Sequence, residues 1–155
     1  LSSSSAASDV YKRQIFLTLV SGMTVLIYFK NEMIFLAFLR LRKQDFPGTE
    51  RWLNKIKNPE SSLVRKQQGY FYYLHGIIQS QNNLTVAEKY FKKAIQLGLS
   101  MTHDLAMAKM SLAGIMMQKR RKREATALLA EAKKLDKHGM LTDQVKMMQQ
   151  QMKRI

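Results

Sequence analysis

The sequence predicts an all-α protein in which an N-terminal apolar helix precedes a short α-solenoid of about three helical hairpins and a capping helix. Three observations support this. The composition favours helix, since Leu, Met, Ala, Lys, Gln and Arg are common and only two of the 155 residues are proline. One run of fifteen residues near the N-terminus carries no charge. The rest of the chain matches itself at a spacing of 38 residues.

The first fourteen residues (LSSSSAASDVYKRQ) differ from the rest of the chain, with four consecutive serines and a polar stretch. They resemble translated adapter or linker sequence. Residues 1–14 are therefore predicted to be a non-native or disordered leader and take no part in the fold argument. Because the first residue is Leu rather than Met, we expect the sequence to be a fragment.

The uncharged run, residues 15–29 (IFLTLVSGMTVLIYF), is apolar on all sides of a helix. At about 1.5 Å per residue it spans roughly 22 Å, against about 30 Å for a hydrocarbon core. A surface helix of a small repeat array should have one polar face, so residues 15–32 predict a transmembrane anchor helix. A buried core helix and a cleaved signal peptide are the alternatives, although no small-x-small cleavage site follows Phe29.

Basic residues after the apolar run set the expected orientation in the membrane. They are Lys30, Arg40, Arg42 and Lys43. The positive-inside rule places the chain that follows them in the cytoplasm. We therefore expect a single-pass protein of a bacterial inner membrane, with the repeat domain on the cytoplasmic side.

The repeat is clearest in the second helix of each unit. Residues 87–94 (AEKYFKKA) align with ATALLAEA, beginning at Ala125, and with TERWLNKI, beginning at Thr49. In the middle copy, Ala87, Phe91 and Ala94 recur at helical spacing and predict one buried face. The small alanines allow two antiparallel helices to approach closely, and the aromatic ring fills the space between them.

Each unit is predicted to be a pair of amphipathic helices, and the three units cover residues 33–59, 65–98 and 102–136. Asn83 is the predicted N-cap of the second helix of the middle unit, and Gly98 is predicted to end that helix. Residues 141–155 predict the capping helix. Its apolar face contains Leu141, Val145, Met148 and Met152.

These patterns resemble the tetratricopeptide repeat family. The family's second helix carries a small residue, an aromatic residue or Leu, a small residue and Leu. This series occurs twice, as Ala87, Phe91, Ala94 and Leu97, and as Ala125, Leu129, Ala132 and Leu135. The resemblance covers about residues 33–136. It implies a right-handed solenoid that binds another protein or a peptide and catalyses no reaction.

The family's register implies a concave, partner-binding groove lined by first-helix side chains. Those side chains are Tyr72, Gln79, Met110 and Met117. Adaptable methionines suit an apolar or helical peptide. The alternative is that the four residues only pack between units. Around Tyr72, the run from Tyr70 to Tyr73 places aromatic rings on every side of one helix, so at least one ring must lie outside the hairpin core.

The formal charge of +15, from 26 Lys and Arg against 11 Asp and Glu, indicates attraction to an anionic surface. The sharpest basic feature lies between the two helices of the third unit and consists of Lys119, Arg120, Arg121, Lys122 and Arg123. This run predicts contact with anionic lipid or an acidic partner. Nucleic acid is the less favoured ligand because no aromatic residues alternate with the basic ones. The other interpretation is a solvated turn that neutralises a helix C-terminus.

No catalytic, cofactor or metal site is predicted. The chain has no cysteine, its three histidines are far apart in sequence, and no phosphate-binding glycine loop or nucleophile elbow occurs. We therefore expect a membrane-anchored scaffold or adaptor that binds a protein or peptide partner. A basic protein that binds nucleic acid or anionic lipid is the alternative, as is a structural subunit of a larger complex. The sequence leaves the oligomeric state open.

Overall fold

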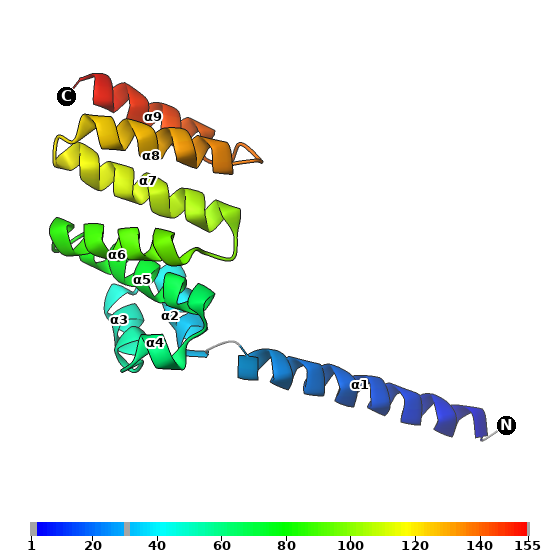
Figure 1. Ribbon diagram of the computed structural model, residues 1–155. Helices are drawn as coiled ribbons and strands as arrows, with labels where there is room; N and C mark the ends of the chain where they lie inside the picture. The colour runs from blue at the N-terminus through cyan, green and yellow to red at the C-terminus, as the bar shows by residue number, and fades with distance from the viewer. Residues whose placement is uncertain (1–2, 30–31, 155) are drawn as a thin grey trace.

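The computed structural model describes the backbone of residues 3–29 and 32–154, and the side chains of residues 9–24 and 32–154. Within these residues the chain forms nine helices and no strand, so the predicted all-α class is confirmed (Figure 1). The parts of the predicted leader, anchor and capping helix at residues 1–2, 30–31 and 155 lie outside the described residues.

The first helix, α1 (Ser3–Phe29), extends away from the other helices (Figure 1). Residues 3–14, expected to be a non-native or disordered leader, are helical and form the first turns of α1. They contain no proline or glycine to interrupt the helix. The large apolar side chains of α1 are exposed, namely Val10, Tyr11, Ile15, Phe16, Leu17, Leu19, Val20 and Met23.

The predicted transmembrane anchor at residues 15–32 is not supported. None of the helices, over the residues that the structure describes, combines the length and the apolar character needed to cross a membrane. The uncharged run is fifteen residues long, and Lys12 and Arg13 precede it within the same helix.

The remaining helices form stacked pairs (Figure 1). The three pairs are α2 (Glu32–Arg42) with α3 (Phe46–Asn54), α5 (Arg65–Gln79) with α6 (Leu84–Leu97), and α7 (Thr102–Gln118) with α8 (Lys122–Leu135). A single turn, α4 (Pro59–Ser62), lies between the first two pairs. The α6 helix packs against α7 and thereby joins the second pair to the third.

The core positions recur with the predicted spacing. Ala87, Phe91 and Ala94 of α6 are at most 1 % exposed. The equivalent positions in α8 are fully buried, and those of the first unit are buried as well: Ala125, Leu129 and Ala132, and Thr49, Leu53 and Ile56. Each hairpin therefore buries the same face of its second helix, as the alignment predicts.

Two predicted helix ends are confirmed. The Asn83 side-chain oxygen accepts hydrogen bonds from the backbone N–H groups of Thr85 and Val86, at 3.1 and 3.2 Å, and so caps α6. Gly98 follows the last residue of α6 and has a φ of 83°. This positive φ is sterically unfavourable for residues that carry a Cβ atom. The chain then turns into α7 over only a few residues.

The predicted capping helix is α9 (Thr142–Lys153), which packs on α8 and α7. Leu141, Val145 and Met152 are buried, and Met148 is half-buried. The loop before α9 is held by Asp136, whose carboxylate accepts hydrogen bonds from the backbone N–H groups of Met140 and Leu141. The apolar face predicted for residues 141–155 thus closes the C-terminal end of the array.

Candidate functional site

The four predicted groove residues lie on α5 and α7, but three of them are largely covered. Tyr72, Met110 and Met117 are each less than 10 % exposed, and Gln79 is half-buried. Little of the three buried side chains is open to a partner, which agrees with the alternative that they pack within the array. Binding of a partner by these residues stays a prediction.

Tyr72 is enclosed by side chains of the neighbouring helix. Its ring stacks on that of Tyr90, with centroids 6.0 Å apart, and the Lys93 ammonium lies 4.3 Å from its centroid. Lys93 also pairs with Glu60 of α4 at 3.2 Å. Glu60 and Tyr72 border one surface hollow, so α4 lies beside the position that the family register assigns to the groove.

The four aromatic residues from Tyr70 to Tyr73 on α5 are not all buried in the hairpin core, as the sequence predicts. Phe71, Tyr72 and Tyr73 are buried, whereas Tyr70 is half-buried and lies toward the third unit. The Tyr70 hydroxyl donates a hydrogen bond of 2.5 Å to Asp104 in the first turn of α7. Burial, followed by this carboxylate, raises the pKa of Tyr70 to about 12. Tyr70 therefore connects the second and third units as a neutral donor.

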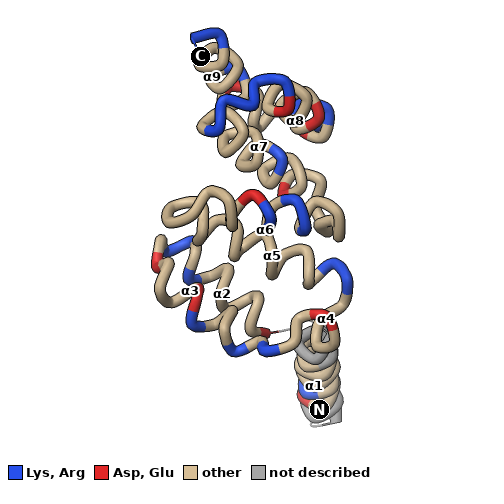
Figure 2. Tube along the Cα trace, turned by 60° about the vertical axis from the view of Figure 1, so that its left-hand side comes forward, with Lys and Arg blue, Asp and Glu red and all other residues tan. Residues whose placement is uncertain are grey.

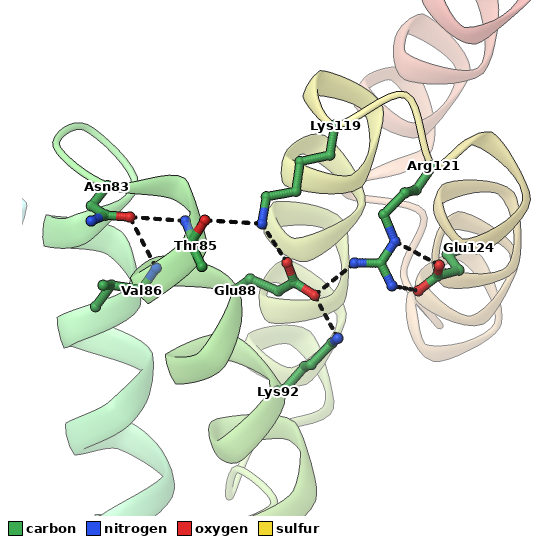
Figure 3. Close-up of polar contacts among 8 residues, drawn as sticks. All are labelled: Asn83, Thr85, Val86, Glu88, Lys92, Lys119, Arg121 and Glu124. Carbon is green, nitrogen blue, oxygen red and sulfur yellow. Dashed lines mark hydrogen bonds and ion pairs between the residues drawn. The ribbon is translucent and has the colours of Figure 1, made fainter.

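The basic run between α7 and α8 is divided by the structure into two groups. Lys119 and Arg121 both bind Glu88 of α6, at 2.7 Å and 2.9 Å (Figure 3). Arg120, Lys122 and Arg123 are exposed, and among the described residues no acidic side chain pairs with them. Two residues of the predicted basic patch therefore form ion pairs within the fold, and the other three remain exposed without an acidic partner in the described part of the chain.

Glu88 is the centre of the structural group. Besides Lys119 and Arg121, its carboxylate accepts a 2.5 Å hydrogen bond from Lys92, one turn later on α6. Only 8 % of Glu88 is exposed. The hydrogen bonds from Lys119 and Lys92, with a smaller contribution from Arg121, lower its pKa to about 2 against the opposing effect of burial. Glu88 is therefore ionised at neutral pH.

The backbone of the α7–α8 turn brings Lys119 and Arg121 to the same carboxylate. Arg120 has a φ of 59°, a left-handed conformation uncommon outside glycine. The N–H of Arg121 bonds to the carbonyl of Met116 at 2.8 Å, as in a helix C-terminal turn with one left-handed residue. Arg121 is further held by two hydrogen bonds of 2.7 Å to Glu124.

The sequence did not point to Glu88 because two of its three partners, Lys119 and Arg121, lie in another unit. The local signal was limited to the spacing of Glu88 and Lys92, which suits an ion pair on one helix face. No pattern in the sequence connects Glu88 with Lys119, more than thirty positions later. Their meeting depends on how α6 stacks against α7.

No candidate metal site is found among the described residues. They contain no group of three His, Asp or Glu side chains placed to hold an ion. His75 is half-buried against Tyr90, at 5.3 Å between ring centroids, and burial lowers its pKa. Its environment is that of a packed aromatic side chain.

Comparison with protein families, curated proteins and solved structures found no match for this chain. The resemblance to tetratricopeptide repeats therefore stays a prediction from the residue pattern.

Proposed function

We propose that this protein is a non-catalytic scaffold of the tetratricopeptide-repeat type. In this proposal α1 attaches it to a membrane and the helical pairs bind another protein. The observation that carries the proposal is the exposed apolar surface of α1. Six large apolar side chains in the described part of the uncharged run, between Ile15 and Met23, are at least 45 % exposed. Contiguous apolar surface of this kind marks a protein or membrane interaction site.

The charges near α1 favour a lipid surface. Arg40 and Arg42 at the C-terminal end of α2, and Lys43 directly after it, follow the apolar run and are exposed. Cationic residues flanking an apolar helix are attracted to anionic headgroups while the apolar part enters the lipid. The single-pass form of this attachment, with the repeat domain in the bacterial cytoplasm, is one version of the proposal.

The repeat domain supports the second half of the proposal. Stacked helical pairs give an extended surface that several side chains can share in binding a peptide. Gln79 is the one predicted groove residue with substantial exposure, so it is the position at which a substitution tests binding without disturbing the core. Changes at Tyr72 or Met110 would also destabilise the fold.

Attachment is tested by flotation of the protein with phosphatidylcholine–phosphatidylglycerol vesicles in high salt. Phe16→Lys with Leu19→Lys should lower vesicle binding by about tenfold or more, since each side chain contributes about 1.5–3 kcal/mol when buried. Val64→Lys with Met140→Lys is the control, because these side chains are equally exposed but lie elsewhere. Equal flotation of both variants would contradict attachment through α1.

Partner binding is tested by purifying the full-length protein from membranes in mild detergent with a high-salt wash. A bound protein that is lost on Gln79→Lys and retained on Gln96→Lys, an exposed position of α6, supports the scaffold function. Retention of the partner by both variants would exclude the groove. Binding of nucleic acid alone, removed by salt, would favour the alternative function through the free basic residues Arg120, Lys122 and Arg123.

A further inference from the structure

A surface cleft between α8 and α9 collects lysines from two distant parts of the sequence. It has a volume of about 430 Å³, within the range of small-molecule sites. Lys122 lies at the start of α8, whereas Lys146 and Lys153 come from α9, the capping helix. Figure 2 shows the basic α7–α8 turn at the same end of the molecule as the C-terminal end of α9.

The three lysines are free to bind a ligand. All three are exposed, and none forms an ion pair with an acidic residue in the described part of the chain. Lys119 and Arg121, by contrast, are held by Glu88. Of the basic run, Lys122 borders the cleft.

The remaining polar groups of the cleft are neutral. Thr126, Gln149 and Gln150 line it, and no acidic side chain does. Three lysines bordering one cavity favour an anion there, because its charge would interact with all of them. The amide groups of the two glutamines add further hydrogen-bond donors. The described lining of the cleft is thus basic, with no acidic side chain to offset its three lysines.

We propose that the α8–α9 cleft binds a ligand that carries several phosphate groups, through Lys122, Lys146 and Lys153. Lysine binds phosphate as a compact point charge, whereas planar carboxylates favour arginine. Among the described residues no aromatic side chain lines the cleft, so a nucleic-acid base has no ring there on which to stack. These features favour clustered phosphates over a peptide carboxylate or a nucleic-acid strand. The inference goes beyond the proposed scaffold function and does not depend on it.

The test measures binding of inorganic tripolyphosphate to the full chain by calorimetry at low and physiological salt. The cleft variant is Lys122→Gln, Lys146→Gln and Lys153→Gln. Its control is Lys133→Gln, Lys134→Gln and Lys137→Gln, which removes the same charge from exposed positions at the other end of α8 and beyond it. The cleft variant should bind about tenfold or more weakly, and the control should change affinity by about twofold or less.

Equal losses in the two variants would overturn the proposal, because binding would then follow net charge alone. Absence of saturable binding by the unaltered protein would overturn it too. Circular dichroism shows whether each variant is folded. In the unaltered protein, tripolyphosphate should protect Lys122, Lys146 and Lys153 from acylation, and leave Lys133 and Lys134 reactive. This measurement keeps the proposal testable if the cleft variant does not fold.

A second arm distinguishes a soluble ligand from a lipid headgroup. Phosphatidylcholine vesicles with and without phosphatidylinositol bisphosphate are compared in flotation. If phosphatidylinositol bisphosphate increases flotation, and only the cleft variant loses that increase, the cleft binds phosphorylated lipid headgroups. If the cleft binds tripolyphosphate but the phosphorylated lipid does not increase flotation, the ligand of the cleft is a soluble molecule. Attachment through α1 should be the same for both vesicle types, so the difference in flotation between them reports on the cleft alone.

Discussion

Lys119 donates a hydrogen bond of 2.7 Å to Glu88 across the boundary between the second and third helical units (Figure 3). Both side chains are partly or largely covered, at 26 % and 10 % exposed. In a solenoid the stability of each unit depends on contact with its neighbours. This contact places a buried carboxylate, shared by three cations, at the boundary between α6 and α7, where Tyr70 and Asp104 form a second polar contact.

Glu88→Gln should therefore destabilise the repeat array. Gln keeps the size of the side chain, but it leaves Lys119 and Arg121 without the charge that holds them. Partly buried ion networks of this kind contribute about 1–3 kcal/mol. The measurement is the free energy of unfolding by urea. Glu60→Gln is the control, because the Glu60–Lys93 pair is exposed and should contribute less than about 1 kcal/mol. Equal losses would contradict the role assigned to Glu88.

The Glu88 contribution should disappear in acid. Its pKa is lowered from 4.5 to about 2, so the folded protein binds this proton less readily than the unfolded chain. The stabilisation is fully present above about pH 4.5 and is lost as the pH falls toward 2. The difference in unfolding free energy between the unaltered protein and Glu88→Gln should shrink over that window. A constant difference from pH 6 to about pH 2 would show that the carboxylate charge is not involved.

The features predictable from the sequence were those set by local periodicity. The spacing of Ala87, Phe91 and Ala94 predicts a buried helix face, and the same face is buried in all three units. Asn83 was predictable as an N-cap because capping involves only the next few residues. These features need no knowledge of how distant helices stack.

The features that the sequence could not supply depend on contacts between units. Glu88 meets Lys119, and Lys122 shares a cleft with Lys146, only once α6 to α9 have stacked. The exposure of Tyr72 likewise depends on its cover by α6 and on the placement of α4, neither of which leaves a pattern in α5. A family register assigns a residue to a face, but it does not show which other side chains cover that face.

Tyr70→Phe should weaken the second contact between the same two units. The substitution removes the hydroxyl that donates to Asp104 and keeps the ring. A hydrogen bond to a carboxylate contributes about 1–2 kcal/mol, so urea unfolding should shift by that amount. Tyr90→Phe is the control, since no hydrogen bond of the Tyr90 hydroxyl is found in the described structure, and it should change stability by less than about 0.5 kcal/mol. The reverse ranking would contradict the Tyr70–Asp104 contact.

Alkaline titration provides an independent check on Tyr70. Its pKa is raised from 10.0 to about 12, so its contribution to stability is complete below pH 10 and is lost as the pH rises toward 12. Phenolate absorbance of the folded protein should show Tyr70 and Tyr73 ionising late, and Tyr70→Phe should reduce the amplitude of that late step by about half. Tyr73, whose pKa is also raised to about 12, mainly by burial, keeps its hydroxyl in the variant and accounts for the late ionisation that remains. A variant titration unchanged at high pH would contradict this assignment.

Gly76 allows α5 and α6 to approach each other at Phe91. A Cβ atom added at Gly76 would lie 3.0 Å from two carbons of the Phe91 ring, closer than ordinary contact. The ring cannot easily move, because only 1 % of Phe91 is exposed. Gly76→Ala should therefore cost about 1–3 kcal/mol of packing energy, which exceeds the gain of about 1 kcal/mol from improved helix propensity.

Gly114 is the equivalent position of the next unit and should respond with the opposite sign. Its nearest neighbour for an added Cβ is the Met148 methyl carbon at 3.6 Å, an ordinary contact. Gly114→Ala then gains helix propensity without a clash and should stabilise the protein by about 0.5–1 kcal/mol. Thermal and urea unfolding of both variants show whether the two substitutions change stability in opposite directions. Destabilisation by both would mean that α7 and α9 pack more tightly at Gly114 than their geometry indicates, whereas stabilisation by both would remove Phe91 as the reason for glycine at position 76.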